Sequence, residues 1–198
     1  MKERKNLAIF FGLLFFSTLW LIFKSKSNQI ETTQTIFLKT PGETVLPIQE
    51  ISQEKIKDRK ETSLIIIHYS ATENGNVEIF RRFHKETNGW DDIGYHFVIT
   101  NGKNGADGEI QKGRALQKQG AHAKGRNHNS IGICLVGNNK FTEKQKKALV
   151  QLTAELCQKY QIKPSEKTIQ SHHEKCPGPG LDLPEIIKEV KIKTQSAL

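Results

Sequence analysis

Cysteine is scarce in this sequence, and no pattern pairs the thiols. The chain has three cysteines, an odd number, and no two of them form a C-x-x-C pair. Small disulfide-stapled domains use an even number of cysteines at regular spacings. The sequence therefore argues against a disulfide framework and leaves at least one thiol as a metal ligand or an ordinary core residue. The three are Cys134, Cys157 and Cys176.

The chain also lacks internal repeats, aromatic-interleaved basic motifs and any RNA-module signature. These absences predict no nucleic-acid partner. The formal net charge is nevertheless +9, and a basic surface attracts any polyanion. Charge alone therefore does not choose the partner. At 198 residues the chain has room for one ordinary domain plus an accessory segment.

Only one long apolar run occurs, at residues 7–23. As a helix it would span about 25 Å, close to the roughly 30 Å hydrocarbon core of a membrane. Basic residues flank it, and no small-residue cleavage site follows. We therefore predict an uncleaved signal anchor, a transmembrane helix over residues 1–24 with a cytoplasmic N-terminus. A cleaved signal peptide and a buried soluble helix are the alternatives.

The composition and the hydrophobic pattern of the chain change at about residue 61. Residues 25–60 are polar and predict a linker, with a short extended piece at 43–48. From 61 to 192, β-branched runs alternate with helical spacing, which predicts an α/β domain: a single domain with a central mixed β-sheet flanked by helices. Residues 193–198 form a tail. Strands are expected at 64–67, 95–100, 131–136 and 168–172, and helices at 77–86, from 141 onward and at 184–191.

Metal-binding and proton-handling side chains follow three of the predicted strands. His68 follows the first, Tyr95 begins the second, and the run His172, His173 and Cys176 follows the last. A catalytic zinc needs about three protein ligands and an open position. Imidazole and thiolate suit Zn²⁺ better than Mg²⁺ or Ca²⁺. Spacing alone leaves this as one possibility, because a lone histidine after a strand is more often a core or surface residue.

Four blocks of the sequence, in order, resemble a known family. They are residues 67–72, 90–97, 120–137 and 172–177, and the likeness extends over 63–190. The chain resembles the zinc amidases of the phage-lysozyme and peptidoglycan recognition protein type, the N-acetylmuramoyl-L-alanine amidases. The resemblance implies hydrolysis of the amide bond between N-acetylmuramic acid and L-alanine in cell-wall peptidoglycan.

The resemblance also implies roles for individual residues. Zn²⁺ would be held by His68, His172 and Cys176, and Tyr95 would direct its hydroxyl toward the metal. The alternative for Tyr95 is a core aromatic residue. A non-catalytic peptidoglycan-binding module is the alternative function, but such members typically lack the cysteine that is present here as Cys176.

Four residues of a glycine-rich loop line the substrate groove in this family. A solvated basic loop is the alternative interpretation. The residues predicted to contact substrate are His122, Lys124, Arg126 and Asn127.

Two departures from the family pattern concern the last block. Only three residues separate His172 from Cys176, where the family has a longer loop. A catalytic lysine usually stands two residues before the cysteine, a place that Glu174 takes here. Lys175 is therefore the candidate for that role. Family alignment selects His172, and not His173, as the ligand.

The remaining cysteines and histidines receive no chemical role. Cys134 lies in the middle of a predicted strand, where cell-wall-recycling relatives carry a glutamate and phage-type members a thiol, and we assign it no role as a base. Cys157 lies on the predicted long helix and is expected to be a core or partly exposed residue. The histidines expected to be structural are His84, His96 and His128.

Anchor and substrate together predict where the protein acts. We expect a single-pass protein of the cell membrane, with the catalytic domain on the extracytoplasmic (periplasmic) side. The expected partners are peptidoglycan and, through the N-terminal helix, the membrane. A regulator that binds an intracellular polymerase is disfavoured, because an exported domain could not meet that partner.

Overall fold

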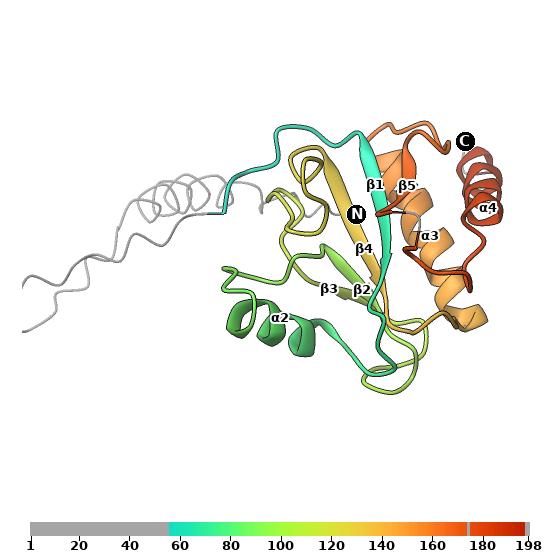
Figure 1. Cartoon of the computed structure of the whole chain (residues 1–198). Coiled ribbons are helices and arrows are strands. Elements are labelled where there is room, and N and C mark those ends of the chain that lie inside the picture. The colour runs from blue at the N-terminus through green and yellow to red at the C-terminus, as the bar shows by residue number, and fades with distance from the viewer. Residues whose placement is uncertain (1–55, 174, 197–198) are drawn as a thin grey trace, which may run out of the picture. The chain divides into compact units, whose positions relative to one another are not determined.

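The computed structural model describes residues 56–173 and 175–196 (Figure 1). The predicted anchor and the extended piece at 43–48 lie outside these residues. Within the described ranges, no helix combines the length and the hydropathy that crossing a membrane requires. The elements are β1 (Leu64–Tyr69), α2 (Val77–Glu86), β2 (Phe97–Ile99), β3 (Ile110–Lys112), β4 (Ser130–Leu135), α3 (Glu143–Lys159), β5 (Ile169–Ser171) and α4 (Leu183–Gln195).

The five strands form one mixed sheet in the order β3-β2-β4-β1-β5. Strands β2, β4, β1 and β5 are neighbours in that order and pair in parallel, and β3 pairs antiparallel with β2. The predicted mixed α/β sheet is confirmed. We did not predict β3, because its Ile110 and Lys112 are exposed and three residues of an edge strand carry no hydrophobic periodicity.

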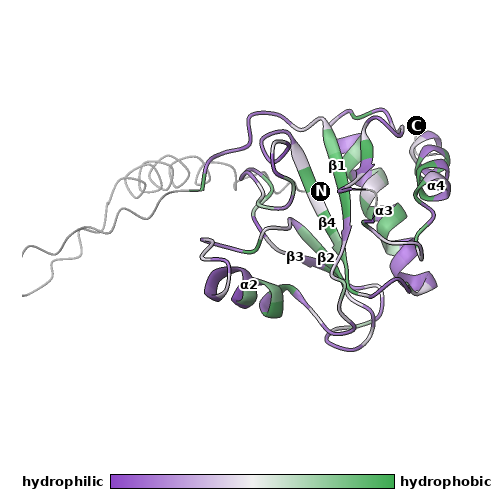
Figure 2. Cartoon of the chain, in the orientation of Figure 1, coloured by the Kyte–Doolittle hydropathy of each residue, from purple (hydrophilic) through white to green (hydrophobic). Residues whose placement is uncertain are grey.

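Strands β1 and β4 are buried on both faces, as their continuous apolar runs predict. Figure 2 shows hydrophobic residues concentrated on these two central strands. Alternate residues of a strand point to opposite faces. Ile65 and Ile67 pack in the cluster that includes α3 and α4 residues, whereas Cys134 packs in the cluster that includes α2 residues. His68 pairs with Cys134 in register, which puts its side chain on the α2 face.

Side-chain caps fix the ends of the helices. Thr142 and Gln145 form the predicted capping box at the start of α3. Gln145 is fully buried and donates from Nε2 to the carbonyl oxygens of Ile99 and Val136, at 3.0 and 2.8 Å. The helix is therefore tied to the ends of β2 and β4. Asp182 caps α4, with a proline in the first turn as the sequence predicts.

The described packing extends beyond the predicted domain limits of 61 and 192. The Arg59 N–H donates to the Gln117 carbonyl at 2.6 Å, and the Gln119 N–H donates to the Lys57 carbonyl at 2.8 Å. Helix α4 continues to Gln195. Part of the segment that we assigned to the linker therefore pairs with the domain.

Candidate active site

Three donor side chains meet where β1 and β5 end. Because these two strands pair in parallel, their carboxyl ends lie together. His68 is the fifth residue of β1, His172 directly follows β5, and Cys176 returns to the same place. One donor atom from each residue lies within 4.8 Å of the other two. The rings of His68 and His172 have centroids 4.7 Å apart.

Backbone bonds hold the short segment between His172 and Cys176. The His172 N–H donates to the Ile67 carbonyl at 3.3 Å, and the Cys176 N–H donates to the His173 carbonyl at 2.9 Å. His173 is exposed, and its Nδ1 accepts from the Lys175 N–H at 3.2 Å. Of the two adjacent histidines, the first is the one that joins the other donors.

His68 is 2% exposed and contacts a second histidine from behind. Its Nε2 lies 3.0 Å from Nδ1 of His122, and Nε2 of His122 lies 3.4 Å from Oγ of Ser130. The Ser130 hydroxyl donates to the Arg126 carbonyl, so its oxygen accepts from His122. His122 then accepts from His68 through Nδ1. This chain of bonds fixes the tautomer of His68 and leaves its Nδ1 lone pair for a metal.

The ionisation of these groups suits metal binding. Burial lowers the pKa of both His68 and His122 well below the usual value, so both rings are neutral. The pKa of His172 is also lowered, by partial burial and by nearby His173 and Arg126. Burial raises the pKa of the Cys176 thiol. A cation at the site would oppose that rise, because a coordinating thiol is deprotonated.

Tyr95 borders the donor set on the α2 face. Its ring centroid lies 5.2 Å from that of His68. Burial raises the pKa of the phenol above its usual value, and Tyr95 packs against the cluster that contains Cys134. The preceding glycine permits this placement, since a Cβ on Gly94 would lie 2.4 Å from the carbonyl oxygen of Ala121.

The loop of predicted substrate-binding residues folds onto the α2 face of the sheet. His122 is 7% exposed and faces His68, which places it behind the donor set and not on a groove surface. Asn127 Oδ1 accepts from the backbone N–H groups of His122 and Ala123, at 3.0 and 2.9 Å. Arg126 binds residues of β5 and its end. Lys124 is the one of the four that is exposed.

The other predicted residues occupy less central positions. Lys175 is exposed, beside Cys176 in the chain, and its catalytic role stays a prediction. His84 and His96 are buried and accept from the N–H groups of Gly94 and Gly132, both at 3.0 Å. His128 is exposed.

We did not predict the roles of Ser130 and Cys134 in the site from the sequence. Ser130 opens β4, and its bond is to His122 Nε2. Cys134 lies in the cluster against which Tyr95 packs, on the face of the sheet that its register partner His68 also faces. Had that register been known, the alternation of side chains along a strand would have placed Cys134 on the face of His68.

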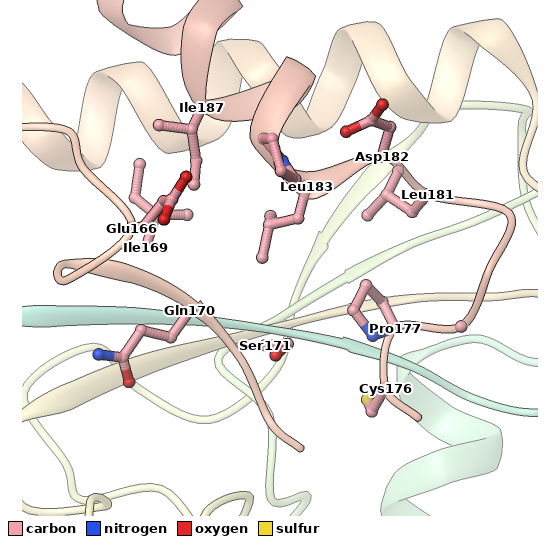
Figure 3. A pocket seen from close by; sticks show the side chains of 12 residues that line it. Glu166, Ile169, Gln170, Ser171, Cys176, Pro177, Leu181, Asp182, Leu183 and Ile187 are labelled. Atoms are coloured by element: carbon pink, nitrogen blue, oxygen red, sulfur yellow. The ribbon is translucent and has the colours of Figure 1, made fainter. Parts of the chain in front are cut away.

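A cavity of ≈ 640 Å³ lies beside β5 and α4 (Figure 3). Of the three donors only Cys176 lines it, together with Gln170 and Ser171 of β5. The carboxylates of Glu166 and Asp182 also line it, among apolar side chains. The cavity therefore adjoins the donor set on its Cys176 side.

Known proteins are similar to this chain in both sequence and fold. The chain is 38% identical over 146 residues to an endolysin of Escherichia phage T7, a match that covers 67% of the chain and 90% of the endolysin. Among solved structures it is similar to the N-acetylmuramoyl-L-alanine amidase LysC from Clostridium intestinale, with 30% identity, a TM-score of 0.59 and coverage of 66% of this chain and 85% of that one. Wild-type Drosophila PGRP-LB gives 30% identity, a TM-score of 0.54 and coverage of 66% and 82%.

The predicted localisation, a single-pass protein of the cell membrane with a periplasmic catalytic domain, is wrong. The relatives that match this chain over most of their own length are phage endolysins. The match covers 90% of the T7 protein, so that relative consists almost wholly of this domain. The membrane as a partner has no support either. Our rejection of an intracellular partner rested on the same localisation and loses its basis.

A family model matches the domain itself. The model for N-acetylmuramoyl-L-alanine amidases matches residues 58–179, which is more than half of the chain and includes the three donors and Tyr95. The endolysin and the LysC structure point to the same group. The chain belongs to the N-acetylmuramoyl-L-alanine amidase family.

Proposed function

We propose that this protein is a zinc hydrolase that cleaves the amide bond between N-acetylmuramic acid and L-alanine in peptidoglycan. One observation carries the proposal: the donor atoms of His68, His172 and Cys176 lie within 4.8 Å of one another, beside Tyr95. Family membership gives the substrate class, and the donor set gives the chemistry.

The donor set fits zinc. Two neutral imidazoles and a thiol are borderline-soft ligands, and three protein ligands with one open position are typical of catalytic zinc. Zinc in such a site supplies Lewis acidity, which activates water near neutral pH and polarises a carbonyl group. His68 is already oriented by His122, as ligating histidines usually are by a second hydrogen bond.

Tyr95 is suited to stabilise the charge that develops on the amide oxygen. The ordinary pKa of a phenol, about 10, already keeps it protonated in the neutral range, and burial raises the pKa of Tyr95 further, so its O–H can donate a hydrogen bond. Losing one such donor typically costs about 10²–10³ in rate. Lys175 is our candidate for a second cationic group, and exposed Lys124 is our candidate contact for stem carboxylates.

The test is digestion of purified peptidoglycan by the full-length chain, with identification of the new termini. We expect free lactyl carboxyl groups and L-alanine amino termini, loss of activity with a chelator, and recovery on adding zinc. New reducing sugar ends would assign a glycosidase instead. Binding without any new terminus would assign the alternative, a non-catalytic peptidoglycan-binding module.

A further inference from the structure

The second histidine of the donor set stands on a weakly supported part of the sheet. Strand β5 has three residues and pairs with β1 alone, because it is the edge strand. His172 follows it, and only three residues separate His172 from Cys176. The His172 N–H bond to Ile67 is long, at 3.3 Å. Backbone pairing alone therefore holds this ligand loosely.

Arg126 supplies a stronger connection from the other side of β1. Its Nη1 donates to Oε1 of Gln170 at 2.7 Å, and its Nη2 donates to the carbonyl oxygen of His172 at 2.7 Å. Both bonds are short and charge-assisted, and a planar guanidinium makes them in one rigid fork. Arg126 thus fixes the C-terminal end of β5 at two points, Gln170 within the strand and His172 directly after it.

The loop that carries Arg126 is itself anchored to the first histidine. Asn127 closes the loop on the His122 backbone, and the His122 ring bonds His68. The Arg126 carbonyl accepts from Ser130, which holds the other side of the His122 ring. One loop therefore contacts both histidines of the donor set, His68 through His122 and His172 through Arg126.

We propose that Arg126 is a positioning residue that holds His172 in place for the metal, and not a substrate contact. This rests on the zinc site proposed above. The guanidinium donors described here are directed at protein acceptors, and its side chain is half-buried. Removing a group that orients a metal ligand typically lowers metal affinity about 10–100-fold.

The test uses the full-length chain with variants Arg126→Ala, Arg126→Lys and Gln170→Leu, and Lys124→Ala as the matched control from the same loop. Zinc affinity is measured by competition with a chelator, the stability of the metal-free protein by denaturant unfolding, and kcat and KM on peptidoglycan. We expect Arg126→Ala to lose about 10–100-fold in zinc affinity. Gln170→Leu should lose less, and Arg126→Lys should lie between wild type and Arg126→Ala. Lys124→Ala should match wild type in zinc affinity and in metal-free stability, and a change in its KM would concern substrate binding alone.

Gln170→Leu separates positioning from direct ligation, because the Gln170 side chain bonds Arg126 and the Lys167 carbonyl and, among the described residues, none of the three donors. Reduced zinc affinity in a Gln170→Leu protein of unchanged metal-free stability supports the proposal, even if Arg126→Ala fails to fold. Wild-type zinc affinity in both Gln170→Leu and Arg126→Lys overturns it, as does a rise in KM alone in the Arg126 variants. Absence of zinc from the wild-type protein would instead refute the proposed function.

Discussion

The packing of His122 against β4 leaves no room for a methyl group at position 132. A Cβ on Gly132 would lie 2.5 Å from Cγ, 2.6 Å from Cδ2 and 2.7 Å from Nδ1 of the His122 ring. Carbon atoms in contact are normally about 3.5–4.0 Å apart, so Gly132→Ala must displace the ring by about 1 Å. Since Nδ1 accepts the bond from His68, the displacement weakens that bond as well.

Both effects destabilise the protein. Overpacking a buried site costs about 1–3 kcal/mol, and leaving a buried polar atom without its partner costs about 1–3 kcal/mol more. We therefore expect Gly132→Ala to lose roughly 2–6 kcal/mol of unfolding free energy and about 10-fold or more in zinc affinity.

The assay is denaturant unfolding of the metal-free full-length chain, followed by chelator competition. Gly125→Ala is the control, because nothing lies within 4 Å of a Cβ there, although its φ of +81° strains any other residue. That variant should lose about 1–2 kcal/mol and keep its zinc affinity. Wild-type stability and zinc affinity in Gly132→Ala would refute the account of how His122 supports His68.

Three further outcomes follow from the site. Tyr95→Phe should lower kcat about 10²–10³-fold while zinc content and stability stay unchanged, since only the hydroxyl is lost; near-normal turnover would make Tyr95 a core residue. His172→Ala should abolish stoichiometric zinc and His173→Ala should retain it, as metal analysis of the two purified proteins will decide. Burial lowers the pKa of His96 to about 4, so the unfolded chain binds more protons between pH 4 and about 6.5. His96 alone should therefore cost the metal-free protein about 3 kcal/mol as the pH falls from about 6.5 to 4, and the lowered pKa values of His68 and His122 add to that fall; a flat profile would contradict buried, neutral histidines.

The sequence predicted the elements whose signals are local. The apolar runs of β1 and β4 and the capping box of Thr142 and Gln145 reappear as expected. Strand β3 escaped prediction, because its pairing with β2 and not its own composition makes it a strand. A short strand can be predicted from local sequence only when one of its faces is buried, because only then do apolar residues alternate with polar ones.

The glycine-rich loop shows where sequence reasoning ends. His122 and Arg126 were expected on a substrate groove, because this loop lines the groove in the family that the sequence resembles. Their contacts are with His68, 54 residues earlier, and with His172, 46 residues later. Such contacts depend on how the loop folds back over the sheet. Gly132 makes room for the His122 ring there, and no local sequence pattern predicts this packing. The residue types and their spacing left the donor set as one possibility, and the resemblance to a family selected it.

X-ray absorption at the zinc edge of the purified full-length chain tests the central claim most directly. The account predicts one zinc per chain with one sulfur ligand at about 2.3 Å and two imidazole nitrogens at about 2.0–2.1 Å. The Cys176→Ser variant should lose the sulfur shell. A zinc environment without sulfur, or a spectrum that Cys176→Ser leaves unchanged, would contradict a site built from His68, His172 and Cys176.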